Sequence, residues 1–413
     1  MRILSGGAAK SEVDRLASRG SQLSALEPRV RRIVKDVRQH GDASLRKYSE
    51  RWDGLAKEQS LRVSVAELKQ VLASSPSELK KSLRQAARNI RQFCEWQKPT
   101  PWKQTRNGIS LGQLIRPLDS VACYVPGGRY PLVSTVLMTV IPAQVAAVKR
   151  IAVVSPKPSP GVMAAAALLG IDEFYRVGGA QAIAALAYGT KTIPSVDKIV
   201  GPGNAYVTAA KKLVVFDCAI DFLAGPTEAV VLSDSGNPDY IAADLVAQAE
   251  HDDDALAVFI TTSHNLAQAV STSVTKFAQS NPTAERSLAR RGSILIAASR
   301  EQARAWANLI APEHITVSKE DVPYIQHAGS VFVGDYSPQS AGDYASGPNH
   351  VLPTAGQARF RGGLSVLDFV KIITVQNLSA SGLRQIAPAI ECLAETEGLL
   401  AHAQSVRVRC ARA

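Results

Sequence analysis

From about residue 118 onward, short β-branched runs alternate with alanine-rich stretches that are long enough to be helices. The first candidate strands cover 120–125, 150–155, 173–177, 198–200 and 229–232. The helical stretches between them cover 134–148, 161–169, 180–188 and 205–213. Strands and helices that alternate in this way build a mostly parallel sheet with crossover helices. The pattern therefore predicts an α/β fold.

The same alternation continues further along the chain. The next candidate strands cover 256–261, 293–297, 314–317 and 329–333. The helical stretches that lie among them cover 238–251, 265–279 and 299–310. A chain of 413 residues is also too long for one ordinary core. We therefore expect two α/β units.

The two ends of the chain have a different character. Charged and apolar residues recur at helical spacing in 11–19, 30–40 and 78–93. Gly20 and Gly41 follow the first two segments, as glycine commonly follows a helix. The last fifty residues are again expected to be helical, most clearly over 383–401.

The net charge of +11 raises the question of nucleic-acid binding. The basic residues are spread along the chain, and short clusters occur only at 29–32 and 407–409. Aromatic residues make up 6% of the chain and do not interleave with these clusters, as a stacking surface for bases requires. The charge therefore favours a solvated basic surface that attracts an anionic cofactor, with no nucleic-acid partner.

The five cysteines are scattered and never spaced as CxxC. This spacing argues against a disulfide framework and against a cysteine zinc site, and it is typical of the reducing cytoplasm. Residues 1–16 lack the long apolar run of a signal peptide. The most apolar stretches are too short or contain proline, so no membrane span is expected.

Three glycine-rich loops follow candidate strands, at 124–128, 177–181 and 201–204. Glycine allows the backbone to approach a phosphate closely, and ligands of open α/β sheets bind at the carboxyl ends of strands. None of the loops is GxGxxG, and each alone is typical of a tight turn. Three in succession indicate a ligand-binding face.

Several polar residues are spaced for chemistry. Gln248 and His251 are three apart in a helical segment, so both can face one ion, although a solvated helix end has the same pattern. Glu313 and His314 can share acid–base work, or simply solvate a loop. A polar loop at 342–350 supplies the possible oxygen ligand Asp343 and His350, and an acid–imidazole pair near the end consists of Glu397 and His402.

These features occur together in one family. The chain resembles histidinol dehydrogenases from about residue 20 to the C-terminus, most densely over 120–355. The matching segments are YVPGG, VGGAQAIAALAYGT, VDKIVGPGN, AGPTEAVVLSDS, VAQAEHD, APEHI, AGSVFVGDYSP and SAGDYASGPNHVLPT. Long literal matches such as GDYASGPNHVLPT are highly specific.

The resemblance implies a role for each matching residue. Zinc would be bound by Gln248, His251, Asp343 and His402. The catalytic acid–base pair would be Glu313 and His314. NAD would contact Tyr124, Gln181 and Asn204. The substrate would contact Thr227, Glu397, the zinc ligands and His314.

The resemblance also implies an organisation into domains. Residues 1–20 would form an N-terminal arm, and 122–228 a Rossmann-like domain that binds NAD. Residues 21–121 and 229–364 would together form the other Rossmann-like domain, which carries the zinc and catalytic residues. A helical tail, 365–413, would reach the partner subunit of a homodimer, so that Glu397 and His402 complete the neighbour's site.

The implied reaction is the four-electron oxidation of L-histidinol to L-histidine through the aldehyde, with two NAD used in sequence. Two departures leave room for a relative that acts on another small alcohol, such as a sulfonated diol: Thr227 stands where some members have serine, and 360–363 differs from the serine-rich version. A zinc-stabilised nucleotide-binding protein without catalysis is the alternative from another class, and a nucleic-acid binder is a third.

Overall fold

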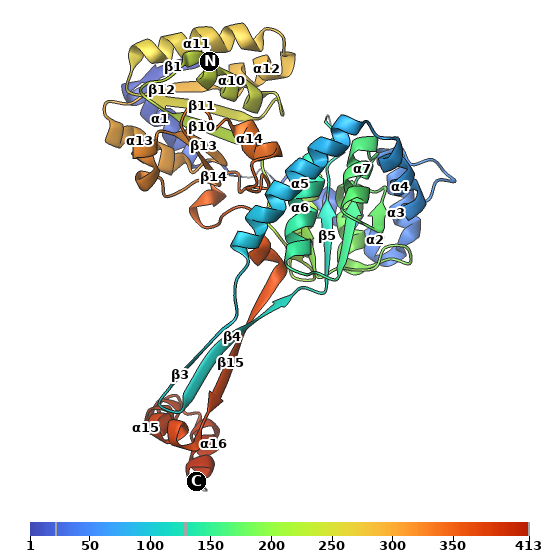
Figure 1. Cartoon of the computed structure of the whole chain (residues 1–413), viewed down its shortest axis with the longest axis vertical. Helices are drawn as coiled ribbons and strands as arrows, with labels where there is room; N and C mark the ends of the chain where they lie inside the picture. Colours follow the sequence, from blue (N-terminus) through green and yellow to red (C-terminus); the bar gives the residue numbers. More distant parts are fainter. Residues whose placement is uncertain (21–22, 128–129, 412–413) are drawn as a thin grey trace.

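The computed structural model describes residues 1–20, 23–127 and 130–411. The chain forms two α/β domains, each with helices on both faces of a sheet, and a long arm that extends away from them (Figure 1). The expected α/β fold with mostly parallel sheets is therefore confirmed. Within the described ranges, no helix is both long and apolar enough to cross a membrane.

One sheet has the strand order β2-β7-β6-β5-β8-β9 and is called the β5 sheet. Its strands are β2 (Arg62–Val63), β5 (Ser120–Tyr124), β6 (Arg150–Val154), β7 (Glu173–Tyr175), β8 (Lys198–Val200) and β9 (Ala219–Ile220). All neighbours pair in parallel except β2, which runs antiparallel to β7. The chain moves outward from β5 to β7 and then crosses to β8, which is the doubly wound order of a Rossmann-like sheet.

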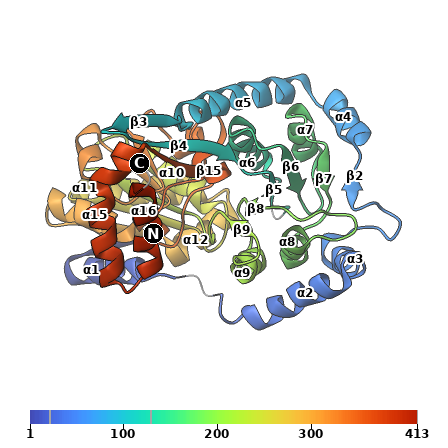
Figure 2. The same cartoon turned by 90° about the horizontal axis from the view of Figure 1, so that it is seen from below.

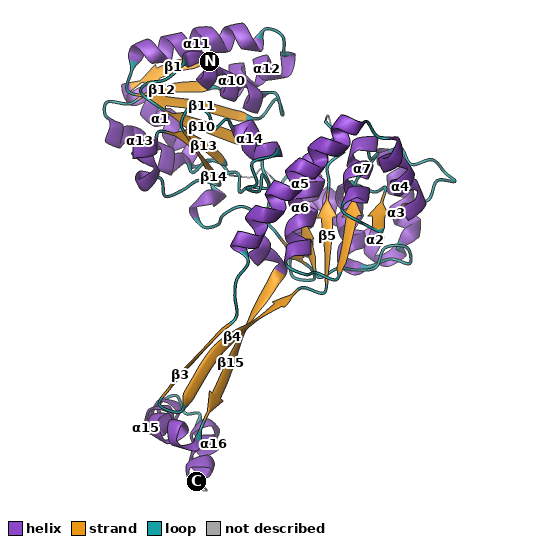
Figure 3. Cartoon of the chain, in the orientation of Figure 1, coloured by secondary structure: helices purple, strands orange, loops and turns teal. Residues whose placement is uncertain are grey.

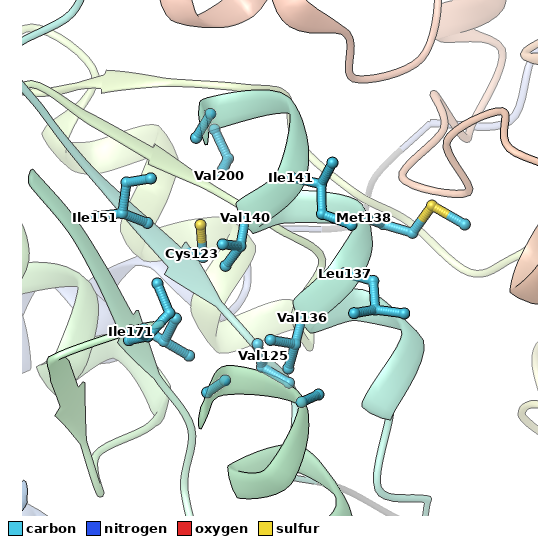
Figure 4. Close-up of a cluster of buried hydrophobic side chains, with 14 of the residues drawn as sticks. Cys123, Val125, Val136, Leu137, Met138, Val140, Ile141, Ile151, Ile171 and Val200 are labelled. Carbon is cyan, nitrogen blue, oxygen red and sulfur yellow. The ribbon is translucent and has the colours of Figure 1, made fainter. Parts of the chain in front are cut away.

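Helices cover both faces of the β5 sheet, and Figure 2 shows the two layers on opposite sides. One layer contains α4 (Val65–Ser74), α5 (Ser77–Gln97), α6 (Val133–Val145) and α7 (Pro160–Leu168). The other contains α2 (Glu27–His40), α3 (Asp42–Tyr48), η1 (Ser49–Asp53), α8 (Gly179–Tyr188) and α9 (Ala205–Val214). In β5, Val121 and Cys123 pack into one core and Ala122 and Tyr124 into the other, because strand side chains alternate. Figure 4 shows Cys123 and Val125 in the first of these cores.

The other sheet has the order β1-β12-β11-β10-β13-β14, is parallel throughout and is called the β10 sheet. Its strands are β1 (Arg2–Ser5), β10 (Glu228–Leu232), β11 (Leu256–Thr261), β12 (Ser293–Ile296), β13 (His314–Val317) and β14 (Ser330–Val333). Its helices are α1 (Gly6–Ala17), α10 (Pro238–Ala249), α11 (His264–Ala278), α12 (Pro282–Arg291), α13 (Arg300–Ile310) and α14 (Gln339–Tyr344). Short 3-10 turns follow at η2 (Lys319–Tyr324), η3 (Gln357–Arg359) and η4 (Val366–Phe369). As in the β5 sheet, the chain moves outward on one side, from β10 to β11 and β12, and then crosses to β13 on the other side of β10.

The arm is an antiparallel sheet of order β15-β4-β3 with two helices at its tip (Figure 3). Its elements are β3 (Trp102–Arg106), β4 (Ile109–Pro117), β15 (Val370–Leu378), α15 (Ala380–Thr396) and α16 (Leu400–Cys410). The expectation of a wholly helical tail is wrong at β15, where a β-branched run pairs along the whole of β4. The helix expected over 383–401 is also interrupted, because Gly398 has a φ of +75° between α15 and α16.

The two sheets group the N-terminal segments differently from the expected domains. Residues 27–97 pack mainly on the β5 sheet, through the contacts of α2 with α8, of α5 with α6 and of β2 with β7. Their contact with 229–364 includes the hydrogen bond from the Asn89 amide of α5 to the Ala345 carbonyl oxygen. Residues 2–17 are also no separate arm, because β1 pairs with β12 and α1 packs on α13. An amphipathic helix shows which of its faces is buried but not which sheet buries it, and this is why the sequence misplaced these segments.

Candidate active site

The first cluster of candidate residues lies where β10 and β13 begin. These strands are neighbours, and Ala229 pairs with His314. Thr227 immediately precedes β10 and Glu313 immediately precedes β13, so the parallel register brings both to the amino edge of the sheet. The β10 domain therefore presents these groups at the edge opposite the one where ligands of doubly wound sheets commonly bind.

Glu313 is buried at the centre of a hydrogen-bond chain. One of its carboxylate oxygens accepts from the Thr227 hydroxyl and from the backbone N–H of Glu228, the latter at 2.9 Å. The Thr227 hydroxyl in turn accepts a hydrogen bond from the side-chain amide of Gln248, which is buried at the end of α10. Three predicted site residues are therefore in direct contact.

The His314 imidazole lies between two carboxylates. Its Nδ1 is 3.7 Å from Glu313 Oε2, and its Nε2 is 3.4 Å from Asp343 Oδ1. Asp343 reaches this place because α14 runs back along the sheet, with Gln339 at its start beside Thr316. The structure thus brings together Glu313, His314 and Asp343 from separate elements.

Burial and charge perturb both members of the pair. Burial raises the pKa of Glu313 to about 7, although His314 and the Thr227 hydroxyl act in the opposite direction. Burial alone would lower the pKa of His314, but the Glu313 carboxylate and Asp343 raise it to about 9. Two groups with strongly shifted pKa values in mutual contact are a common feature of catalytic sites.

Three imidazoles act on the Asp343 carboxylate. Burial acts to raise its pKa, but the hydrogen bond and charge of His314, with smaller effects of His350 and His251, hold the pKa below its usual value. His350 is held structurally, since its Nδ1 lies 2.8 Å from the Asp343 carbonyl oxygen. His251 is exposed two residues beyond the end of α10, with Nδ1 3.1 Å from the Ala247 carbonyl oxygen.

The structure does not bring Glu397 and His402 to this cluster within one chain. Both side chains are exposed at the tip of the arm, in and beside α15 and α16 (Figure 1). The part of the chain that the structure describes contains no group of three or more His, Cys, Asp or Glu arranged to hold a metal ion.

The three residues predicted to contact NAD share a pocket in the β5 domain. It has a volume of about 440 Å³ and lies at the carboxyl ends of β5, β6 and β8. Tyr124, Gln181 and Asn204 all line it. The Tyr124 hydroxyl accepts from the Gly179 N–H at 3.0 Å, and Asn204 caps the start of α9.

Several pocket residues have no signal in the sequence. Asp53 is buried and accepts hydrogen bonds from the Gly178 N–H at 3.0 Å and from the Gln181 amide at 3.1 Å. Trp52 and Arg29 come from the same N-terminal segment, which the sequence assigned to the other domain. Their place in the pocket depends on how η1 and α2 pack on the β5 sheet.

The glycines of these loops are needed for contacts between the loops themselves. A Cβ on Gly127 would lie 2.0 Å from the Pro156 carbonyl oxygen, and one on Gly201 would lie 2.2 Å from that of Tyr124. Gly201 also has a φ of +110°, which favours glycine. The glycines therefore allow neighbouring strand ends to pack tightly and shape one wall of the pocket.

A buried ion pair fixes the last of the loops. The Lys211 ammonium donates to Asp221 Oδ1 at 2.7 Å and to the Gly201 carbonyl oxygen. The other Asp221 oxygen accepts from the Gly201 N–H at 2.7 Å. The 201–204 loop is thus held by hydrogen bonds at both the backbone N–H and the carbonyl oxygen of Gly201.

Two doubly wound domains, one with a pocket at its carboxyl edge and one with a buried carboxylate–imidazole pair, define a two-domain α/β enzyme. The family model described as Histidinol dehydrogenase matches residues 16–410. A histidinol dehydrogenase from Geobacillus kaustophilus is 48% identical over 391 residues, covering 91% of this chain and 92% of its own. One from Methanothermobacter thermautotrophicus is 46% identical with the same coverage.

A solved structure leads to the same family. The crystal structure of histidinol dehydrogenase from Elizabethkingia anophelis superposes with a TM-score of 0.93 at 38% identity, over 99% of this chain and 98% of its own. The chain therefore belongs to the histidinol dehydrogenase family and is an oxidoreductase.

Proposed function

We propose that this protein oxidises L-histidinol to L-histidine through L-histidinaldehyde, with zinc and two NAD per turnover. Family membership supports the substrate. The single structural observation that carries the proposal is the buried Glu313–His314 pair, with the two residues 3.7 Å apart and joined to Thr227 and Asp343. This arrangement offers a base and a water-activating group side by side.

The residues of one chain fit part of a zinc site. Asp343 and His251 offer a carboxylate oxygen and an imidazole nitrogen, and both are ordinary zinc ligands. Gln248, in the last turn of α10, can offer an amide oxygen, and His251 follows two residues after the helix ends. Among the described residues of one chain we assign no fourth ligand, and His402 of a second copy is proposed to supply it. Zinc there would act as a Lewis acid that orients the substrate.

The pocket in the β5 domain fits a dinucleotide. The N-termini of α8 and α9 face it, and these supply backbone N–H groups and positive partial charge for a pyrophosphate. Trp52 and Tyr206 offer aromatic surface beside Arg29. Tyr124, Gln181 and Asn204 are proposed to contact NAD, which would accept the hydride in each step.

The chain's own residues are proposed to move the protons. His314 would take the hydroxyl proton of the alcohol as the hydride leaves its carbon, and it would do the same for the aldehyde hydrate. Glu313 would remove a proton from the water that adds to the aldehyde. Thr227 holds the Glu313 carboxylate by its hydroxyl and is proposed to contact the substrate as well.

A homodimer is proposed to complete each site. The arm exposes apolar side chains on its strands and tip helices, including Ile372, Ile373, Leu393 and Leu400, and these need a covering surface. Pairing of two arms would bury them and carry Glu397 and His402 into the partner's site. Glu397 would then contact the substrate.

Two further points belong to the proposal. All five cysteines are free, which supports a cytoplasmic location. A relative that oxidises a sulfonated diol remains the second candidate, because Thr227 stands at a proposed substrate contact.

The test is NADH formation, followed by absorbance, with L-histidinol and with a sulfonated diol. Activity with histidinol that disappears on chelation and returns with zinc supports the proposal. Activity with the diol but not with histidinol would show that histidinol is not the substrate and would favour the diol. NAD binding without any turnover would indicate a nucleotide-binding protein without catalysis.

A further inference from the structure

A second hollow continues the dinucleotide pocket along α2 and η1. It has a volume of about 500 Å³ and shares Arg29, Ile33 and Trp52 with the first pocket. Its cationic side chains are Arg29, Arg32, Lys35, Lys47 and Arg51, and we call this set the cationic groove.

The cationic groove holds unneutralised charge. Among the described residues, no carboxylate lies within ion-pair distance of Arg29, Arg32, Lys35 or Arg51, and only Lys47 has one, in Asp36 at 3.8 Å. Beside these cations, the Trp52 ring stacks on Tyr48 at a centroid distance of 4.8 Å. Unpaired cations next to an exposed aromatic ring form a surface suited to a phosphorylated, ring-containing ligand.

The end of β6 carries a cation as well. In the doubly wound order β6 is the second strand, and the residue after this strand normally decides between the two nicotinamide dinucleotides. An acid there bonds the ribose 2′-hydroxyl of NAD, whereas a nearby cation accommodates the 2′-phosphate of NADP. In this chain Lys157 lines the pocket just after β6. Its side chain lies over the turn after η1, since a Cβ on Gly54 would be 2.7 Å from its Cε.

One acid lies near this lysine, because the positive charge of Lys157 acts on the buried Asp53 carboxylate. Asp53 is the one carboxylate among the described residues lining the first pocket, and it is buried and already accepts from Gly178 and Gln181. The pyrophosphate of a dinucleotide can be held by the helix N-termini at Gly179 and Ala205. The cations of the cationic groove are therefore left for a further phosphate group, and Lys157 lines the adjoining pocket.

We propose that the pocket accepts NADP+ as well as NAD+, with Lys157 and the cationic groove holding the 2′-phosphate. This inference rests on the proposed function, because it assumes that a nicotinamide dinucleotide occupies the pocket. It concerns binding, and the hydride transfer is the same with either dinucleotide.

The test is calorimetric titration of the full-length protein with NAD+ and with NADP+. The variants are Lys157→Gln and Arg51→Gln, and the matched control is Lys276→Gln on α11 of the other domain. Glutamine at 157 keeps a Cβ at the positive φ of +46°, so backbone strain stays comparable. We expect Lys157→Gln to weaken NADP+ binding about tenfold more than NAD+ binding, because a charge-assisted hydrogen bond is lost. We expect a smaller selective loss for Arg51→Gln and none for the control.

Two results would overturn the inference: no measurable binding of NADP+ by the unaltered protein, or equal weakening of both dinucleotides in Lys157→Gln. Histidinol oxidation with NAD+, run in parallel, tests the proposed function separately. Turnover with NAD+ but no binding of NADP+ would remove this inference and leave the proposed function intact.

Discussion

Nε2 of His314, at the first residue of β13, lies 3.4 Å from Oδ1 of Asp343, in the last turn of α14. The same imidazole has Glu313 on its other side, at 3.7 Å from Nδ1. This contact joins the polar segment after β14 to the acid–imidazole pair at the start of β13. It gives the site a proton acceptor whose charge state depends on two carboxylates.

The stability of the metal-free protein should fall as the pH rises. Burial raises the pKa of Glu313 to about 7, and the carboxylates of Glu313 and Asp343 raise that of His314 to about 9. Both values lie above those of the unfolded chain, so the folded state binds more protons between about pH 5 and pH 9. The contribution of these two groups to the free energy of unfolding is complete below about pH 5 and is lost as the pH rises to about 9. Thermal unfolding across this range, compared with His314→Gln, measures the effect, and an equal slope in both proteins would contradict it.

Replacing Glu313 by Gln should impair the oxidation of the aldehyde more than that of the alcohol. The amide keeps the hydrogen bond from Thr227 but cannot take a proton from water. We expect the aldehyde step to slow by about 10²–10⁴-fold, the usual contribution of a general base. Single-turnover measurements with histidinol and with histidinaldehyde separate the two steps. An equal loss in both would assign Glu313 another role.

Two inactive variants should restore activity when they are mixed. Glu313→Gln removes a residue of the cluster, and His402→Ala removes one at the tip of the arm. In a shared-site dimer, the mixed dimer has one site with both residues intact, so random reassembly should recover about a quarter of full activity. The measurement is turnover after joint unfolding and refolding, with each variant refolded alone as the control. Lack of recovery would indicate that each site belongs to one chain.

Replacing Lys211 by Met should destabilise the β5 domain strongly. The side chains of Lys211 and Asp221 are only 3% and 1% exposed, so the variant leaves a buried carboxylate unpaired. The expected loss is roughly 3–5 kcal/mol of the free energy of unfolding. The matched control is Lys371→Met on the arm, where the pair with Asp119 is 4.0 Å long and exposed, and its loss should stay below about 1 kcal/mol. Urea unfolding measures both, and similar losses would show that burial of the pair is unimportant.

The sequence determined the elements of the two domains. Their β-branched runs and alanine-rich stretches became strands and helices, some with the expected bounds, as with 314–317 and β13, and others with ends shifted by a few residues. This is possible because alternation and helical periodicity are local properties of the chain. The local motifs also placed Glu313 beside His314, whereas the helix that carries Gln248 ends at Ala249, before it reaches His251.

The tertiary structure alone decided which sheet each N-terminal helix covers, and with it the presence of Asp53 and Trp52 in the pocket. It also decided that β15 pairs with β4 along the arm, and that α14 runs back to place Asp343 on His314. The physical reason is that these contacts join segments far apart in the chain. The sequence shows that an apolar helix face must be covered and that a β-branched run must be paired. It does not show which segment does so, because that depends on tertiary packing.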